Sequence, residues 1–146
     1  MAGKFKLQSV LNYRQSLEGQ AQHALAASQK RQHELEGQLQ LQQKNLQQYD
    51  SELKQRQEEG LTVAEMDLYE SQIQHCHYLS EGIRERLQQL EQQIVSERAA
   101  LLHAAQERQV MEKLKDNQET AYRQELSRKE RVMLDEISLR SKGNKS

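Results

Sequence analysis

The spacing of the apolar residues constrains this chain more than any other feature. Over the first 59 residues, apolar side chains recur at steps of three and four, and polar residues occupy the same phase at a few positions. The series comprises Ala21, Leu25, Ser28, Gln32, Leu35, Leu39, Gln42, Leu46, Tyr49 and Leu53. Such positions are the a and d sites of heptads, which line one stripe of an α-helix. The pattern predicts a helix over 5–59.

A second series with the same spacing follows residue 60. It comprises Met66, Tyr69, Ile73, Cys76, Ile83, Leu87, Leu90, Ile94, Leu101, Ala104 and Met111. The phase slips near Leu114, and the stripe then continues through Tyr122, Leu126, Met133 and Ile137. This series predicts a second helix over 62–140. The last residues, 141–146, contain no apolar anchor and are expected to fray.

The segment between the two series has the composition of a turn, which we place at 60–62. Gly60 can end the first helix, because glycine readily adopts the left-handed conformation found just after helix ends. Thr62 and Glu65 have the spacing of a capping box, which starts a helix. No proline interrupts either helix.

Folding back at this turn brings together residues whose numbers sum to about 122. The register opposes Leu46 to Cys76 and aligns two polar layers, Gln42 with Ser80 and Arg14 with Arg108. The two arginines form a like-charge layer, so we expect them to extend toward solvent. The sequence therefore predicts an all-α, rod-like, two-helix antiparallel coiled-coil hairpin that forms a single domain over 1–146.

Composition agrees with this class. Only 35% of the residues are hydrophobic and 4% aromatic, whereas 29% are charged. That is too little apolar material for a compact globular core, but it suffices for a narrow stripe along each helix. The chain has one cysteine and no apolar leader after its first residues, from which we expect a cytoplasmic location.

Charge is sorted along the chain. Residues 1–31 contain five Lys or Arg against one Glu, residues 123–146 seven against four acids, and residues 32–122 nine against seventeen. In an antiparallel hairpin the two basic segments lie at the end that carries both termini, and the shaft and turn are acidic. Two such ends offer different electrostatic surfaces to partners.

Catalytic, metal and cofactor sites are not predicted. His75, Cys76 and His77 form the one His/Cys cluster, but helical neighbours two residues apart point in different directions and do not share a metal ion. The sequence lacks a glycine-rich phosphate loop, and a two-helix rod offers no concave site. We therefore expect a protein that is not an enzyme and needs no cofactor.

Nucleic acid and the membrane are likewise not expected as direct partners. The basic residues over 123–131 alternate with Glu125 and Glu130, whereas DNA-binding basic regions carry denser positive runs. No apolar run has the roughly 20 residues that span a bilayer. Protein contacts remain the expected role, and Tyr13, Tyr69, Tyr78 and Tyr122 are candidate exposed anchors, with Tyr69 beside Leu68 at the turn favoured.

Three segments resemble the FliJ family of bacterial flagellar export proteins. They are Phe5-Lys-Leu-Gln-Ser-Val-Leu-Asn-Tyr-Arg14 at the start, Gly60-Leu-Thr-Val-Ala-Glu-Met-Asp-Leu-Tyr69 at the turn, and Met133-Leu-Asp-Glu-Ile-Ser-Leu139 near the end. The resemblance covers nearly the whole chain, and the landmarks occur in the family's order.

The resemblance implies a component of the flagellar type III export apparatus. It would bind the hexameric export ATPase as a central stalk, contact the cytoplasmic domain of the membrane export gate and escort export chaperones. It would lie on the cytoplasmic face of the inner membrane through these partners, without inserting into it. We expect the basic end, with Arg128, Lys129 and Arg131, to contact the ATPase, and Leu68 and Tyr69 to contact the gate.

Two alternatives share these sequence features. A generic coiled-coil scaffold or spacer, including a parallel homodimer interrupted near Gly60, would show the same heptads. The equivalent stalk of a virulence type III secretion system would have almost the same sequence pattern. The oligomeric state would distinguish the generic scaffold from the flagellar export protein. Genomic neighbourhood would distinguish the virulence stalk from it.

Overall fold

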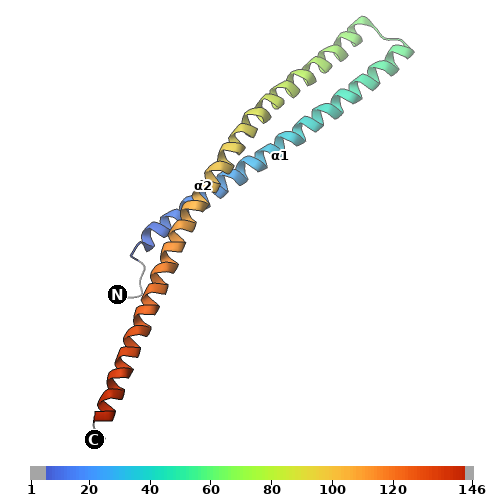
Figure 1. The fold of residues 1–146 in the computed structure, drawn as a ribbon. Helices are drawn as coiled ribbons and strands as arrows, with labels where there is room; N and C mark the ends of the chain where they lie inside the picture. Colours follow the sequence, from blue (N-terminus) through green and yellow to red (C-terminus); the bar gives the residue numbers. More distant parts are fainter. Residues whose placement is uncertain (1–5, 144–146) are drawn as a thin grey trace. The chain divides into compact units, whose positions relative to one another are not determined.

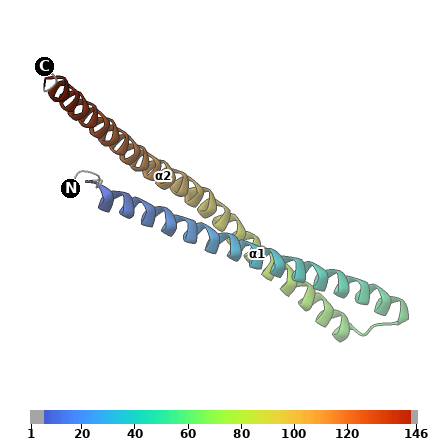
Figure 2. The same ribbon diagram turned by 90° about the horizontal axis from the view of Figure 1, so that it is seen from below.

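The fold consists of two long helices packed against each other. It is known from a computed structural model that describes residues 6–143. Over these residues it contains α1 (Gln8–Glu59) and α2 (Val63–Gly143) and no strand (Figure 1). A short turn joins the two helices, as both views show (Figure 2). This confirms the predicted all-α helical hairpin.

The helix ends differ from the predicted ends by a few residues. Helix α1 begins at Gln8. The amide of Leu11, inside the helix, donates to the carbonyl of Leu7, the residue before the helix, at 3.0 Å. The predicted start at Phe5 lies outside the described residues. Helix α2 continues to Gly143, past the predicted end at 140, and carries Arg140 and Lys142 in its last turn. Positive charge there favours the helix C-terminus, whose carbonyls give it a partial negative charge. Residues 144–146 of the predicted frayed tail lie outside the described residues.

The turn uses the residues that the sequence indicated. Gly60 directly follows α1 and has φ of 105°, a conformation that glycine adopts without the steric cost of a Cβ atom. The amide of Glu65 donates to Thr62 Oγ1 at 3.2 Å, so Thr62 caps the N-terminus of α2. Gly60 and Thr62 thus end one helix and start the next within three residues.

The chain divides into two compact units, which we describe separately. Unit 1 contains residues 1–20 and 101–146, and unit 2 contains residues 21–100. Each unit draws on both α1 and α2, because the chain leaves unit 1 along α1 and returns to it along α2.

Unit 2 is packed at the heptad positions. Leu35 is only 2% exposed to solvent, and Cys76, Ile83 and Ile94 are also buried. The heptad residues between them are half-buried, and the residues on the outer faces are exposed. This alternation at steps of three and four confirms the predicted helix-helix contact in this unit. Met66 departs from the pattern, because it is exposed at the beginning of α2.

Two polar residues are buried among these apolar side chains. Ser80 and Ser28 are both largely inaccessible to solvent. The Ser28 hydroxyl donates to Glu97 Oε1 at 2.8 Å, and Gln93 donates from Nε2 to the same serine oxygen at 3.5 Å. Small hydroxyl side chains fit the narrow space between the helices, and the hydrogen bonds of Ser28 offset the cost of burying its hydroxyl.

Unit 1 has a much smaller core. Its buried apolar residues among those described are Leu11 on α1 and Met111 on α2, which pack together. Their numbers sum to 122, the value that the predicted register requires. In unit 2, the pairs Arg56–Glu65 and Glu52–Tyr69 both sum to 121, which is within one residue of it.

Candidate partner-binding surfaces

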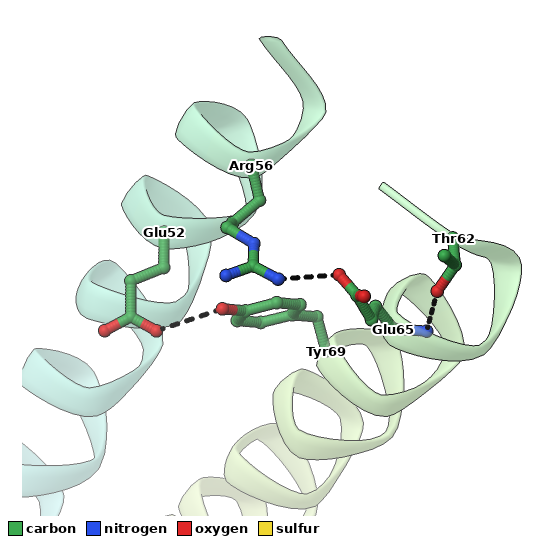
Figure 3. A network of polar contacts seen from close by, with 5 residues as sticks. All are labelled: Glu52, Arg56, Thr62, Glu65 and Tyr69. Atoms are coloured by element: carbon green, nitrogen blue, oxygen red, sulfur yellow. Dashed lines mark hydrogen bonds and ion pairs between the residues drawn. The ribbon is translucent and has the colours of Figure 1, made fainter. Parts of the chain in front are cut away.

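A polar network connects the two helices beside the turn (Figure 3). Arg56 donates from Nη2 to Glu65 Oε2 at 2.7 Å, and the Tyr69 hydroxyl donates to Glu52 Oε2 at 3.4 Å. The hydrogen bond from Arg56 to Glu65 is the main cause that raises the pKa of this guanidinium. The network fixes the end of α1 against the start of α2.

This network separates the two residues that we had expected to act together. Leu68 is 61% exposed on the outer face of α2. Tyr69 is only half-buried rather than exposed, because its ring lies toward α1 and its hydroxyl contacts Glu52 (Figure 3). The expectation that Tyr69 is exposed is therefore wrong, and its contact with a partner stays a prediction. Leu68 remains available at the turn, near the exposed acidic residues Glu59, Asp67 and Glu70.

The other predicted tyrosines are exposed. The exposed fraction is 74% for Tyr78 and 60% for Tyr13, and Tyr122 is near the lower limit of exposure at 36%. Tyr78 lies beside a surface groove in unit 2 that was not predicted from the sequence. The groove has a volume of about 660 Å³, and its lining includes Leu41, Tyr78 and Gly82.

The shape of this groove follows from its sequence. Gly82 carries no side chain, and a Cβ atom placed there would meet nothing within 4 Å. Leu41 and Tyr78 flank the hollow as large exposed side chains. A second, smaller hollow of about 330 Å³ shares Gln42 and Leu79 with it and also contacts Cys76. The sequence does contain a signal for this groove. Gly82 follows Tyr78 by four residues on α2, the register puts Leu41 of α1 near them, and both large residues lie outside the heptad positions.

The C-terminal part of α2 forms a different kind of surface. From Ala121 to Gly143 every residue is exposed, including Leu126, Met133 and Ile137 of the predicted stripe. An apolar stripe with polar residues on the other faces is typical of a helix that packs against a partner helix. Within the described chain, this stripe is not buried.

The three cations predicted to contact a partner lie on this same segment. Arg128, Lys129 and Arg131 are all exposed. Arg128 and Arg131 are three residues apart, so they share one face of the helix. Lys129 points elsewhere and forms an ion pair with Glu125, from Nζ to Oε1 at 3.8 Å. The two arginines are therefore brought together, and the lysine is separated from them.

The like-charge layer of Arg14 and Arg108 is resolved by acidic neighbours. Arg14 pairs with Glu107 at 3.6 Å, and Arg108 donates from Nε to Glu18 and from Nη1 to Glu112. The hydrogen bond to Glu18, followed by that to Glu112, raises the pKa of Arg108. We had expected both arginines simply to extend toward solvent. Instead, each forms ion pairs with acidic residues. Carboxylates at the same contact neutralise them.

Net charge follows the division into units. The sequence of unit 1 contains 13 Lys or Arg and 9 Asp or Glu, whereas that of unit 2 contains 8 and 13. Their balances of +4 and −5 give the total of −1 for the chain. The two units thus differ in the sign of charge that they present to a partner.

The described residues contain neither a cluster of metal-ligating side chains nor a long apolar helix stretch. Over 6–143, no three His, Cys, Asp or Glu residues are grouped so that they could hold a metal ion. Neither α1 nor α2 contains a stretch with both the length and the apolar character that a membrane span needs.

Comparison with known protein families decides the family. The family described as "Flagellar FliJ protein" matches residues 3–146. The chain belongs to the FliJ family. As a FliJ-family chain it is a flagellar export-related protein, and this family is a non-enzymatic export component. No curated protein and no solved structure matches it.

Proposed function

We propose that this FliJ-family chain is the central stalk of the flagellar export ATPase and links the ATPase ring to the membrane export gate. The observation that carries the proposal is the exposed segment of α2 from Ala121 to Gly143. In a family of export proteins, this segment offers both an apolar stripe and a pair of arginines to a partner.

The ATPase contact is assigned to this segment for two reasons. Its stripe, represented by Leu126, Met133 and Ile137, has no cover in the described chain, so burial against a partner would be favourable. Arg128 and Arg131 lie outside the stripe and can steer an acidic surface toward it. A stalk of this kind acts by packing and steering and requires no active site.

The gate contact is assigned to the turn. Leu68 provides an exposed apolar side chain there, and the acidic residues around it give this surface the opposite charge to unit 1. Tyr69 contributes indirectly, because its half-buried ring lies toward α1 and helps to hold the first turns of α2 in place. The two partners would then bind different units of the chain.

Export chaperones are the third class of partner that the proposal includes. Chaperone escort fits the groove beside Leu41 and Tyr78, which has room for apolar side chains of a helix and lies outside both contacts above. Through these partners the protein would lie on the cytoplasmic face of the inner membrane. The stalk of a virulence secretion system and a generic coiled-coil spacer are the alternatives.

A charge-reversal experiment tests the ATPase contact. Arg128→Glu with Arg131→Glu should weaken binding to the export ATPase by roughly tenfold at low salt, because steering by exposed charges is lost. Adding Lys129→Glu should weaken it little further, since Glu125 already pairs with this lysine. Circular dichroism should show unchanged helicity.

The matched control reverses two exposed lysines of unit 2. Lys44→Glu with Lys54→Glu changes the net charge by the same amount but should leave ATPase binding unchanged. The difference between the two variants should shrink at high salt, because exposed charges are screened. Equal loss of binding in both variants would mean that total charge, rather than the α2 segment, governs the interaction.

A further inference from the structure

The N-terminal segment of α1, residues 8–18, is held on α2 by few apolar contacts. Leu11 is its one buried residue, and it packs on Met111. The next positions toward unit 2 are Arg14 and Glu18, both charged, where unit 2 has apolar residues at most equivalent sites. Burial of apolar area, the main source of helix-helix stability, is therefore small here.

Charge replaces apolar packing at this contact. Glu18 and Arg108 retain side-chain exposures of only 16% and 24%, and they are joined by a hydrogen-bonded ion pair. Glu112 accepts a second hydrogen bond from Arg108 at 2.8 Å, and Arg14 pairs with Glu107 at 3.6 Å. Ion pairs that remain partly exposed weaken as salt is added, whereas apolar contacts do not.

Gly19 directly follows this segment. Glycine is a poor helix former, and a Cβ atom at this position would meet nothing within 4 Å, so packing does not require it. Gly19 therefore lowers the helix propensity at the junction between residues 8–18 and the rest of α1, beside the segment that has the fewest apolar contacts. A break at Gly19 would leave the heptad packing of unit 2 intact.

We propose that residues 8–18 form a salt-sensitive strap, which opens from α2 as a local unit while unit 2 remains folded. Opening uncovers Met111 and the adjoining face of α2, on the same helix that carries the exposed stripe through Leu126 and Met133. Where the proposed function holds, the strap sets how much of α2 the ATPase can contact. The opening itself is a property of the chain alone.

Hydrogen exchange of the full chain, measured by mass spectrometry without any partner, tests the strap. Amides over 8–18 should exchange at least about tenfold faster than those over 28–46, because local openings expose only the weaker unit. Raising salt from about 0.05 M to about 0.5 M should speed exchange over 8–18 several-fold, since it screens the ion pairs, and leave 28–46 unchanged.

Two sets of variants separate the strap from ordinary fraying of a helix end. Glu18→Gln should speed exchange over 8–18 and reduce its salt dependence, leaving the part that comes from Arg14 and Glu107. The matched control is Glu34→Gln, whose ion pair with Arg31 lies within α1 alone and should not affect the strap. Oxidised Leu11→Cys with Met111→Cys, in a Cys76→Ala background, should slow exchange over 8–18, and reduction should restore it.

Equal exchange over 8–18 and 28–46 at both salt concentrations would overturn the strap. Fast exchange over 8–18 that neither salt nor Glu18→Gln changes would also overturn it, because it would show simple fraying. A failure of ATPase binding would not affect these results, since no ATPase is present, so the strap and the stalk are tested separately.

Discussion

Arg56, near the end of α1, donates a hydrogen bond to Glu65, near the start of α2, at 2.7 Å. The pair crosses the turn and lies in the same register as Glu52 and Tyr69 one helical turn further on (Figure 3). Because both pairs obey one register, the turn has little freedom to slip by a residue. The position of Leu68 on the outer face follows from this register.

The turn should depend on Gly60 through its backbone conformation. Gly60→Ala places a Cβ atom at φ of 105° and should lower the free energy of unfolding by about 1 kcal/mol or more. The matched control is Gly37→Ala inside α1, where a Cβ atom meets nothing within 4 Å. That change should raise stability by roughly 0.5 to 1 kcal/mol, because alanine is the better helix former. Urea unfolding followed by circular dichroism measures both, and effects of the same sign would contradict the assigned turn.

The core of unit 2 should depend on Leu35, which is 2% exposed. Leu35→Ala removes a buried side chain and should cost about 2 to 4 kcal/mol of unfolding free energy. Leu102→Ala, on an outer face of α2, should stay within about 0.5 kcal/mol of the wild type. Thermal melting of the three proteins compares them. Similar melting of the Leu35 and Leu102 variants would show that the helix-helix contact does not stabilise the chain.

The register can be read by a disulfide. Leu46 is half-buried on α1 and Cys76 is buried on α2, and their numbers sum to 122. Leu46→Cys should therefore form an intramolecular bridge with Cys76 under mild oxidation, provided that the Cα atoms lie within about 7 Å. The expected product has a monomeric mass and no free thiol. A disulfide-linked dimer through Cys76 in the wild type, with no internal bridge in the variant, would instead support a parallel homodimer.

Much of the hairpin could be predicted because two long helices follow directly from local rules. Heptad spacing located the residues that are buried in unit 2, and Gly60 with Thr62 located the turn. The register followed from the turn position, since an antiparallel pair has one register once its turn is fixed. Helix ends were less predictable. The lack of an apolar anchor predicted fraying after residue 140, but α2 continues through Ser141 and Lys142. Positive charge in the last turn stabilises a helix C-terminus without an apolar contact.

The candidate surfaces were harder to predict than the fold. The sequence pattern assigned Tyr69 both to the helix-helix contact and to the exposed surface. Its hydrogen bond to Glu52 on α1 shows that it lies at the helix-helix contact. The network around Arg108 depends on which carboxylates lie within reach, and these come from both helices. The groove beside Gly82 depends on a missing side chain, which heptad spacing does not register.

The two residues at the turn should differ in function. Leu68→Ala removes an exposed side chain and should weaken binding to the cytoplasmic domain of the export gate without changing thermal stability. Tyr69→Phe removes the hydroxyl that donates to Glu52 and should leave gate binding nearly unchanged, because the ring remains in place. Pull-down with the gate domain compares the two variants. Greater loss for Tyr69→Phe would show that this hydroxyl, rather than Leu68, contacts the gate.

The stoichiometry of the complex with the export ATPase tests the central claim most directly. A central stalk occupies the axis of a hexamer, so native mass spectrometry of the mixed proteins should show one copy of this chain for six ATPase subunits. The complex should form with the wild type and weaken with Arg128→Glu and Arg131→Glu. One copy per ATPase subunit, or no complex at all, would contradict the stalk.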